Sequence, residues 1–151
     1  MANNGTEADQ APKRPGDGPR TWHSLVMTVP PATEEIILRV PARPPYGRIV
    51  RVGAAALALR QGMTFGEIDD VRLAIDESMI LLLDGATGDG VIDCVFRMTA
   101  GRFELEALNT GEHSIAPAAL RRFVEHAAEL VDDYDVDPRR GWLRIRKDHI
   151  E

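Results

Sequence analysis

Cysteine is almost missing from this sequence, and its scarcity removes two classes of site. Cys94 is the single cysteine among 151 residues, which excludes an intrachain disulfide and any zinc cluster built on thiolates. Its position inside a predicted strand favours a buried, inert thiol over a nucleophile. One cysteine also suits a reducing compartment, so we expect a cytoplasmic protein.

An excess of basic residues is missing as well. Lys and Arg number 18 against 24 Asp and Glu, which gives a formal net charge of −6. Non-specific attraction to nucleic acid or to anionic lipid needs a basic excess, so we expect neither direct nucleic-acid binding nor membrane binding. The longest apolar runs, Gly53–Leu59 and Met79–Leu83, fall far short of the ~20 residues that span a bilayer. No apolar segment follows a basic start, so we expect no signal peptide.

Several site motifs are also lacking. No stretch has the glycine spacing of a P-loop or a dinucleotide fold. The histidines are scattered, without a pair at metal-ligand spacing, so we expect no metal site; they are His23, His113, His126 and His149. One acidic cluster lacks the alternating ligands and central glycine of a calcium loop, and we expect it to be a solvated loop at a helix end. It consists of Glu129, Asp132, Asp133, Asp135 and Asp137.

Apolar residues make up 44% of the chain, enough for one globular domain. Residues 1–20 contain no Leu, Ile, Val, Phe, Trp or Tyr and cannot offset their ordering entropy by burial. We therefore predict a disordered tail over residues 1–21 and a folded domain over residues 22–151. Residues 22–29 have the composition of a short edge strand or a packed arm.

The periodicity of apolar residues predicts an α+β fold. In order, we expect a strand at 34–40, helices at 46–60 and 64–83, strands at 90–98 and 102–108, a helix at 116–130 and a strand at 141–147. This order predicts a two-layer sandwich, with a mixed or antiparallel sheet and the helices on one face.

Two features of the first two helices bear on function. Ile49, Val52, Ala56 and Leu59 lie at helical spacing with arginines toward the flanks, which is typical of an amphipathic helix. The turn Met79–Leu83 is apolar all round, which implies burial on several sides or packing against a partner. Just before this turn comes Glu77, a candidate general base, although a mid-helix glutamate usually faces solvent.

The element order and three stretches of sequence resemble the bacterial anti-sigma factor and serine-protein kinase family. The stretches are residues 38–44 leading into a helix with Arg48, residues 68–77, and residues 130–137 followed by 141–147. The resemblance runs from about Glu34 to Lys147. It implies a GHKL-type (Bergerat) ATPase fold.

The departures from the family pattern concern its nucleotide site. In an active kinase of the family, a glutamate orients water or a serine hydroxyl, and an asparagine four residues later holds magnesium. Glu77 matches the glutamate, but the asparagine position is Leu81, which has no lone pair for a hard cation. The family aspartate that accepts from adenine corresponds to Asn109, close to Gly111, and a following glycine is absent. Residues 114–120 are too short for the glycine-rich lid over the phosphates.

The resemblance therefore implies a degenerate, actinobacterial-type member in which Glu77, Leu81, Asn109 and Gly111 are remnants of a nucleotide pocket. Phosphoryl transfer depends on metal and positioning, so ATP with magnesium is not expected as a cofactor, whereas another small ligand remains open. Glu77 is then only a vestige of the catalytic base.

The first function that the resemblance implies is that of an anti-sigma factor. Such a protein sequesters an alternative sigma factor and is released by an anti-anti-sigma protein, usually as a homodimer. Arg48 falls where the family has a sigma-contacting arginine, and its neighbours Arg43 and Arg51 are further candidates. The alternative is an active ATP-dependent serine-protein kinase with Glu77 as base. A third reading has the vestigial pocket bind a different small ligand that tunes release.

Overall fold

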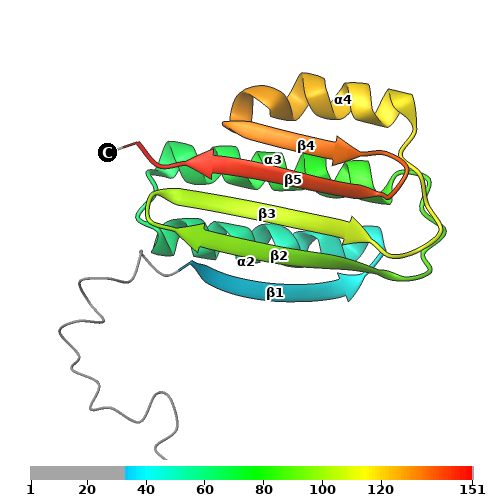
Figure 1. Cartoon of the computed structure of the whole chain (residues 1–151), viewed down its shortest axis with the longest axis horizontal. Coiled ribbons are helices and arrows are strands. Elements are labelled where there is room, and N and C mark those ends of the chain that lie inside the picture. Colours follow the sequence, from blue (N-terminus) through cyan, green and yellow to red (C-terminus); the bar gives the residue numbers. More distant parts are fainter. Residues whose placement is uncertain (1–32, 151) are drawn as a thin grey trace, which may run out of the picture. The chain divides into compact units, whose positions relative to one another are not determined.

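The structure is a computed structural model that describes residues 33–150. It has an α+β architecture in which one five-stranded sheet packs against three α-helices (Figure 1). The elements are β1 (Glu34–Pro41), η1 (Pro44–Tyr46), α2 (Gly47–Arg60), α3 (Phe65–Leu83), β2 (Val91–Thr99), β3 (Arg102–Asn109), α4 (Pro117–Ala127), η2 (Ala128–Leu130), β4 (Asp133–Asp137) and β5 (Trp142–Asp148). The predicted tail and the predicted segment 22–29 lie outside the described residues.

All neighbouring strands are antiparallel, in the order β1-β2-β3-β5-β4. Helices α2 and α3 lie behind the sheet in Figure 1, and α4 runs beside α3 on the β4 side. This arrangement is consistent with a GHKL-like ATPase fold and confirms the predicted sandwich.

The core lies between the sheet and the helices. Every second residue of β2 and β3 is buried, and the rings of Phe96 and Phe103 pack with centroids 5.8 Å apart. Cys94 is fully buried on this face, and burial raises the pKa of its thiol to about 12 because the thiolate is poorly solvated there. The prediction that this thiol is buried is confirmed, and its inertness stays a prediction.

The acidic cluster is not a loop, and that prediction was wrong. Residues Asp133–Asp137 form β4, an edge strand paired with β5. Tyr134 and Val136 alternate with the aspartates and pack on the core, and the Tyr134 ring meets Phe123 edge-on with centroids 5.7 Å apart. Asp133 lies on the other face, where Arg144 and Arg146 of β5 form ion pairs with it. The predicted helix at 116–130 is α4 followed by the short η2.

The expected apolar face of the helix at 46–60 is the face that α2 turns to solvent. Val50, Ala54 and Ala58 are buried, whereas Ile49 and Val52 are 49% and 61% exposed. The helix carries apolar residues on two sides, and the small alanines occupy the side that faces the interior. In the apolar turn at 79–83, Met79, Leu81 and Leu82 are buried, whereas Ile80 is 44% exposed and Leu83 is half-buried. The turn is therefore buried on several sides but not all round.

The start of α3 is fixed by its cap and by the end of the chain. Thr64 and Glu67 form a capping box. The backbone amide of Glu67 donates to Thr64 Oγ1 at 3.2 Å, and the Thr64 amide donates to Glu67 Oε2 at 2.8 Å. His149 Nδ1 lies 2.7 Å from the same oxygen. These bonds, that of His149 foremost, lower the pKa of Glu67 to about 2.

Within residues 33–150, none of the helices combines the length and the apolar character that crossing a bilayer requires.

Candidate functional site

Glu77, the candidate base, lies between α3 and α4. Its side chain is 15% exposed, and both carboxylate oxygens accept from Arg122 of α4, each at 3.3 Å. The pair is bidentate, a geometry that suits guanidinium and carboxylate. The carboxylate therefore bridges two helices, and its proton-accepting oxygens are already engaged.

Leu81 lies one turn further along α3 and is fully buried in the hydrophobic core. A helical residue four positions after Glu77 shares its side of the helix, but here that position points into packed side chains. Leu81 therefore offers no oxygen and has no solvent around it in which a hydrated cation would lie.

Asn109 is buried at the end of β3, and both ends of its amide are used. Its Nδ2 donates to the carbonyl oxygen of Leu82 at 2.9 Å, and its Oδ1 accepts from the backbone amide of Gly111 at 2.9 Å. A buried polar group is stable only when it is paired in this way. The amide therefore joins the last turns of α3 to the end of the strand.

Gly111 allows two backbone segments to touch. A Cβ at this position would overlap the carbonyl oxygen of Asp89. Across the contact, Gly90 has φ +87°, and a Cβ there would lie 2.6 Å from the Gly111 nitrogen. Both positions need glycine, the first for space and the second also for its left-handed backbone. The sequence singles out Gly111 through the family pattern, whereas the partner Gly90 was missed.

The segment between Gly111 and α4 is short, and hydrogen bonds hold both of its ends. Thr110 exchanges hydrogen bonds with Val91 at 2.9 Å, and Ile115 is buried with its amide bonded to the carbonyl of Pro138 at 2.9 Å. Pro117 then begins α4. The four remnant positions thus serve packing, bonding and close approach, and the residues present do not fit a nucleotide held through magnesium.

The three candidate arginines lie together around the start of α2. Arg48 and Arg51 line a groove of about 470 Å³ whose opposite wall includes Met79, Ile80 and Leu83 of α3. Arg43 precedes η1 and borders an adjoining hollow. We call this surface the arginine face, defined by Arg43, Arg48 and Arg51.

The charges of the arginine face are only partly neutralised. Arg51 Nη1 lies 3.2 Å from Asp76 Oδ2, but no carboxylate of residues 33–150 lies within ion-pair distance of Arg43 or Arg48, both of which are exposed. Gly47 brings this end of α2 close to α3, because a Cβ there would lie 3.2 Å from Met79 Cβ. No pattern in the sequence indicates this close approach.

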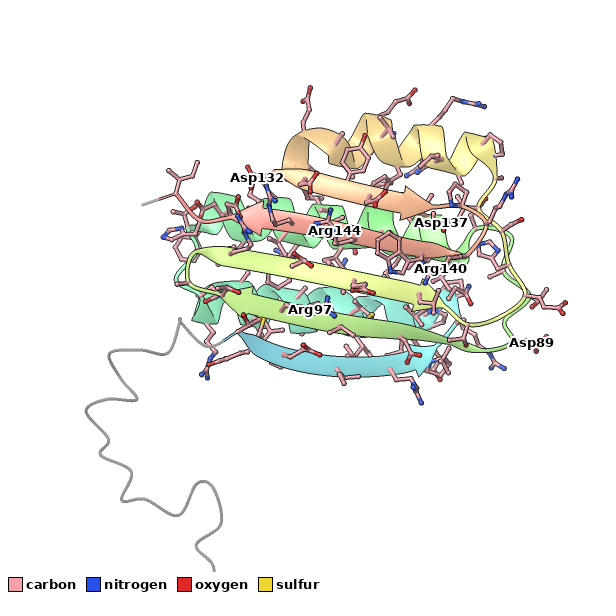
Figure 2. All side chains as sticks on the ribbon, in the orientation of Figure 1. Asp89, Arg97, Asp132, Asp137, Arg140 and Arg144 are labelled. Atoms are coloured by element: carbon pink, nitrogen blue, oxygen red, sulfur yellow. The ribbon has the colours of Figure 1, made fainter. Side chains whose placement is uncertain are left out.

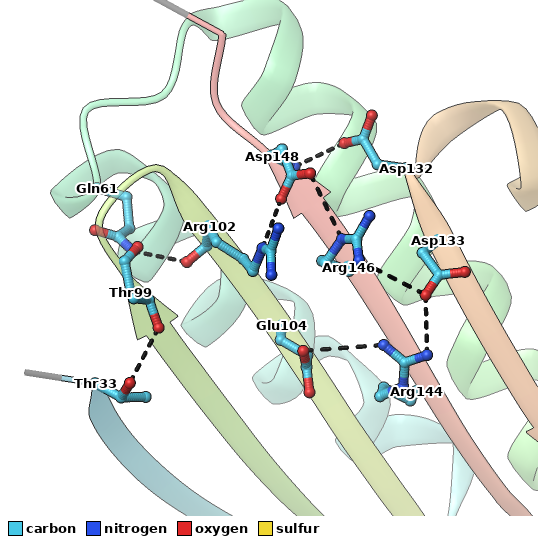
Figure 3. Close-up of polar contacts among 10 residues, drawn as sticks. All are labelled: Thr33, Gln61, Thr99, Arg102, Glu104, Asp132, Asp133, Arg144, Arg146 and Asp148. Carbon is cyan, nitrogen blue, oxygen red and sulfur yellow. Dashed lines mark hydrogen bonds and ion pairs between the residues drawn. The ribbon is translucent and has the colours of Figure 1, made fainter. Parts of the chain in front are cut away.

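The face of the sheet that is turned away from the helices carries a continuous chain of ion pairs (Figures 2 and 3). The sequence did not predict this chain. Arg97 contacts Glu106 at 2.7 Å, Glu35 at 3.5 Å and Glu104 at 3.8 Å. Glu104 in turn lies 3.9 Å from Arg144. The chain continues from Arg144 to Asp133 at 2.9 Å, from Asp133 to Arg146, from Arg146 to Asp148, and from Asp148 to Arg102 at 3.0 Å.

These ion pairs lower the pKa values of two of the carboxylates. Arg144 lowers the pKa of Asp133 by hydrogen bonding, and Arg97 lowers the pKa of Glu106, to which Trp142 Nε1 also donates at 3.1 Å. Charged residues alternate with apolar ones in β2, β3 and β5, so the solvated face was predictable. The pairing was not, because it depends on strand order.

Comparison with known proteins gives distant relatives over most of the chain. The serine-protein kinase RsbW of Bacillus cereus (strain B4264) is 28% identical over 138 aligned residues, covering 78% of this chain and 86% of that protein. The serine-protein kinase RsbW of Bacillus thuringiensis (strain Al Hakam) is 27% identical with the same coverage. No family model matches the chain. The chain is thus a distant relative of the RsbW serine-protein kinases over most of its length, which supports the resemblance to the anti-sigma factor and serine-protein kinase family.

Proposed function

We propose that this protein is an anti-sigma factor that sequesters an alternative sigma factor in the cytoplasm and no longer acts as a kinase. The observation that carries the proposal is the arginine face. Arg43 and Arg48 lack a carboxylate partner within residues 33–150. Arg48 lines a groove with apolar walls from α3 and two aspartates, Asp76 and Asp84, and Arg43 lines the adjoining hollow. Unpaired arginines beside apolar surface are suited to an acidic protein partner.

The remnant positions support the loss of kinase activity. Phosphoryl transfer needs a metal that neutralises charge on the phosphates and a base that is free to act. Leu81 is an apolar core residue, Glu77 is paired with Arg122, and the amide of Asn109 bonds to Leu82 and Gly111. The relatives named as kinases make active phosphorylation the alternative function, and release by an anti-anti-sigma protein remains part of the proposal.

Charge reversal at Arg48 tests the sigma contact. We expect Arg48→Glu to fold normally, because Arg48 is exposed and unpaired among the described residues, and to bind the sigma factor more slowly and more weakly. Arg121→Glu on α4 is the matched control, since Arg121 is also exposed. Surface plasmon resonance at two salt concentrations measures both rates. Unchanged affinity and association rate in Arg48→Glu would place the interface elsewhere.

Calorimetry with ATP and magnesium tests the loss of the nucleotide site. We expect no measurable heat of binding, because a triphosphate would have no metal ligand at Leu81 and would have to displace buried apolar side chains. A radiolabel transfer assay on the anti-anti-sigma protein should show no product. Micromolar ATP binding together with transfer that disappears in Glu77→Ala would restore the kinase function.

A further inference from the structure

We propose that Asp84 is a site of spontaneous isomerisation to isoaspartate, and that the fold protects Asp89 from the same reaction. The loop between α3 and β2 contains the Asp-Gly sequence twice, as Asp84–Gly85 and Asp89–Gly90. Glycine has no side chain to hinder attack by its own backbone nitrogen, so Asp-Gly is the sequence in which this reaction is least hindered. The inference concerns the chemistry of this loop and does not depend on the proposed function.

The reaction joins two neighbouring groups of the chain. The backbone nitrogen of Gly85 attacks Cγ of Asp84, a C–N bond forms, and the C–OH bond of the carboxyl group breaks. The hydroxyl and the amide proton leave as water, and the product is a cyclic succinimide. A water molecule then adds to one of its two carbonyl carbons. Addition at the original Cγ restores aspartate, whereas addition at the other carbon leaves the main chain running through Cγ, which is isoaspartate.

The surroundings of Asp84 leave both reacting groups accessible. Asp84 directly follows α3, and both Asp84 and Gly85 are exposed. Among residues 33–150, the Asp84 carboxylate has no hydrogen-bond or ion-pair partner, and the Gly85 amide donates no hydrogen bond. The dipeptide is therefore held in place by few contacts of its own.

Ring closure also requires a backbone rotation that the loop after Asp84 permits. The rotation is about ψ of Asp84, which is 120°. It breaks one hydrogen bond of the turn, from the amide of Ala86 to the carbonyl oxygen of Leu83 at 3.1 Å. Gly85 has φ +68°, and a Cβ at this position would meet nothing within 4 Å. Glycine is free to change its backbone region, so Gly85 can follow the rotation.

Packing blocks the same rotation at Asp89, which lies beside the start of β2 (Figure 2). A Cβ on Gly90 would lie 2.6 Å from the Gly111 nitrogen, and a Cβ on Gly111 would overlap the Asp89 carbonyl oxygen. The carbonyl oxygen of Gly90 accepts from the amide of Ala42 at 3.2 Å, and Asp89 Oδ2 lies 3.5 Å from Thr87 Oγ1. The Gly90 nitrogen cannot turn toward Cγ of Asp89 unless these contacts open.

Isomerisation at Asp84 would alter the groove of the arginine face. Asp84 lines this groove together with Arg48 and Arg51. Isoaspartate adds one carbon to the main chain directly after α3 and attaches the free carboxylate to Cα. The net charge is unchanged, but the negative charge beside the two arginines moves. Ageing of the chain would therefore change the electrostatics of this surface without a change in mass.

Peptide mapping of aged protein tests the assignment. The full-length chain is kept at neutral pH and physiological temperature for several weeks and is then digested. Electron-transfer fragmentation locates isoaspartate in each peptide, and labelling by an isoaspartyl methyltransferase quantifies it. A synthetic peptide of residues 82–92, in which no fold protects either dipeptide, is aged in parallel. The sequences Asn4–Gly5 and Asp17–Gly18 lie outside the described residues, and their peptides are quantified separately.

The two dipeptides serve as matched controls for each other. We expect isoaspartate at both positions of the synthetic peptide. In the folded chain we expect it at Asp84 and at least about tenfold less at Asp89, where the reaction waits for local opening. Asp84→Glu should lose the signal at position 84, because glutamate would have to close a larger, less favoured ring, and Asp89→Glu should keep it. Equal isoaspartate at the two positions of the folded chain, more at Asp89, or none at Asp84 overturns the proposal.

Discussion

The amide of Asn109 lies between the end of β3 and the last turns of α3, with one hydrogen bond at each end. An aspartate has almost the same shape but only acceptor oxygens when it is ionised. At this position one of those oxygens would face the carbonyl oxygen of Leu82. The residue that the family uses for adenine is therefore incompatible with the bonds that this chain makes.

Asn109→Asp tests this role directly. We expect it to lower the free energy of unfolding by about 1–3 kcal/mol at neutral pH, because a buried donor is lost and a charge meets a carbonyl. The deficit should shrink in acid, where a protonated carboxyl can donate to Leu82. Urea denaturation of the variant and the parent at several pH values measures both effects. Equal stability at neutral pH would show that the amide bonds are dispensable.

At the scale of elements, period-two and period-3.6 patterns were sufficient to predict most helices and strands. These patterns failed in two cases: a helix with apolar residues on two sides, and a strand in which charged residues alternate with buried ones. In α2, the large residues Ile49 and Val52 suggested the buried face, but the alanines opposite fit the narrow space beneath the helix. In β4, three of the five residues are aspartates, a composition that does not predict a strand. The strand follows only from the pairing of β4 with β5, which places Asp133 and Asp135 opposite arginines.

In the candidate site, too, the sequence predicted the positions of residues but not the contacts between them. Sequence spacing correctly put Leu81 on the helix of Glu77 and Asn109 at a strand end. It gave no indication that Arg122 would reach Glu77 or that the backbones of Gly90 and Gly111 would touch. Those contacts join segments far apart in the chain, so they depend on how the elements are assembled.

The contact between the start of α3 and the C-terminal residues should weaken in acid, because it depends on the ionised carboxylate of Glu67. The pKa of Glu67 is about 2 in the folded protein, below its ordinary value of 4.5, chiefly because of the hydrogen bond with His149. A depressed carboxylate pKa stabilises the fold above the unfolded pKa. That contribution is complete above about pH 4.5 and is lost as the pH falls toward 2.

Glu67→Gln removes this carboxylate from the titration. We expect the variant to be less stable than the parent at neutral pH and the difference to diminish as the pH falls from 4.5 to 2. The urea midpoint measured against pH gives the result. Glu125→Gln, at an exposed position of α4, is the control and should run parallel to the parent. A constant gap between Glu67→Gln and the parent would contradict the assignment.

At the scale of the whole molecule, the outer edge of β1 is our candidate surface for a homodimer. Among residues 33–150, strand β1 pairs with β2 alone, and Ile37 is 69% exposed. An exposed edge with apolar side chains is a template for pairing with another chain. The homodimer that the family resemblance implies stays a prediction.

We therefore expect a dimer by light scattering at micromolar concentrations, and a shift toward monomer in Ile37→Lys, because a lysine on an edge strand opposes pairing. Val124→Lys should remain dimeric. A monomeric parent, both with and without the sigma factor, would contradict the prediction. A dimer that Ile37→Lys leaves intact would place the interface away from β1.

The arginines of the ion-pair chain on the outer sheet face have carboxylates only 2.7–3.9 Å away. These distances are shorter than the Debye length of about 8 Å at physiological salt. The paired positive and negative charges therefore largely cancel, and this face projects little electrostatic potential into solution. Arg43 and Arg48 lie on a chain of net charge −6. An acidic partner is repelled by the molecule as a whole and attracted near the start of α2. On the proposed function, we expect collisions on other faces to separate quickly, which makes capture oriented and its rate dependent on ionic strength.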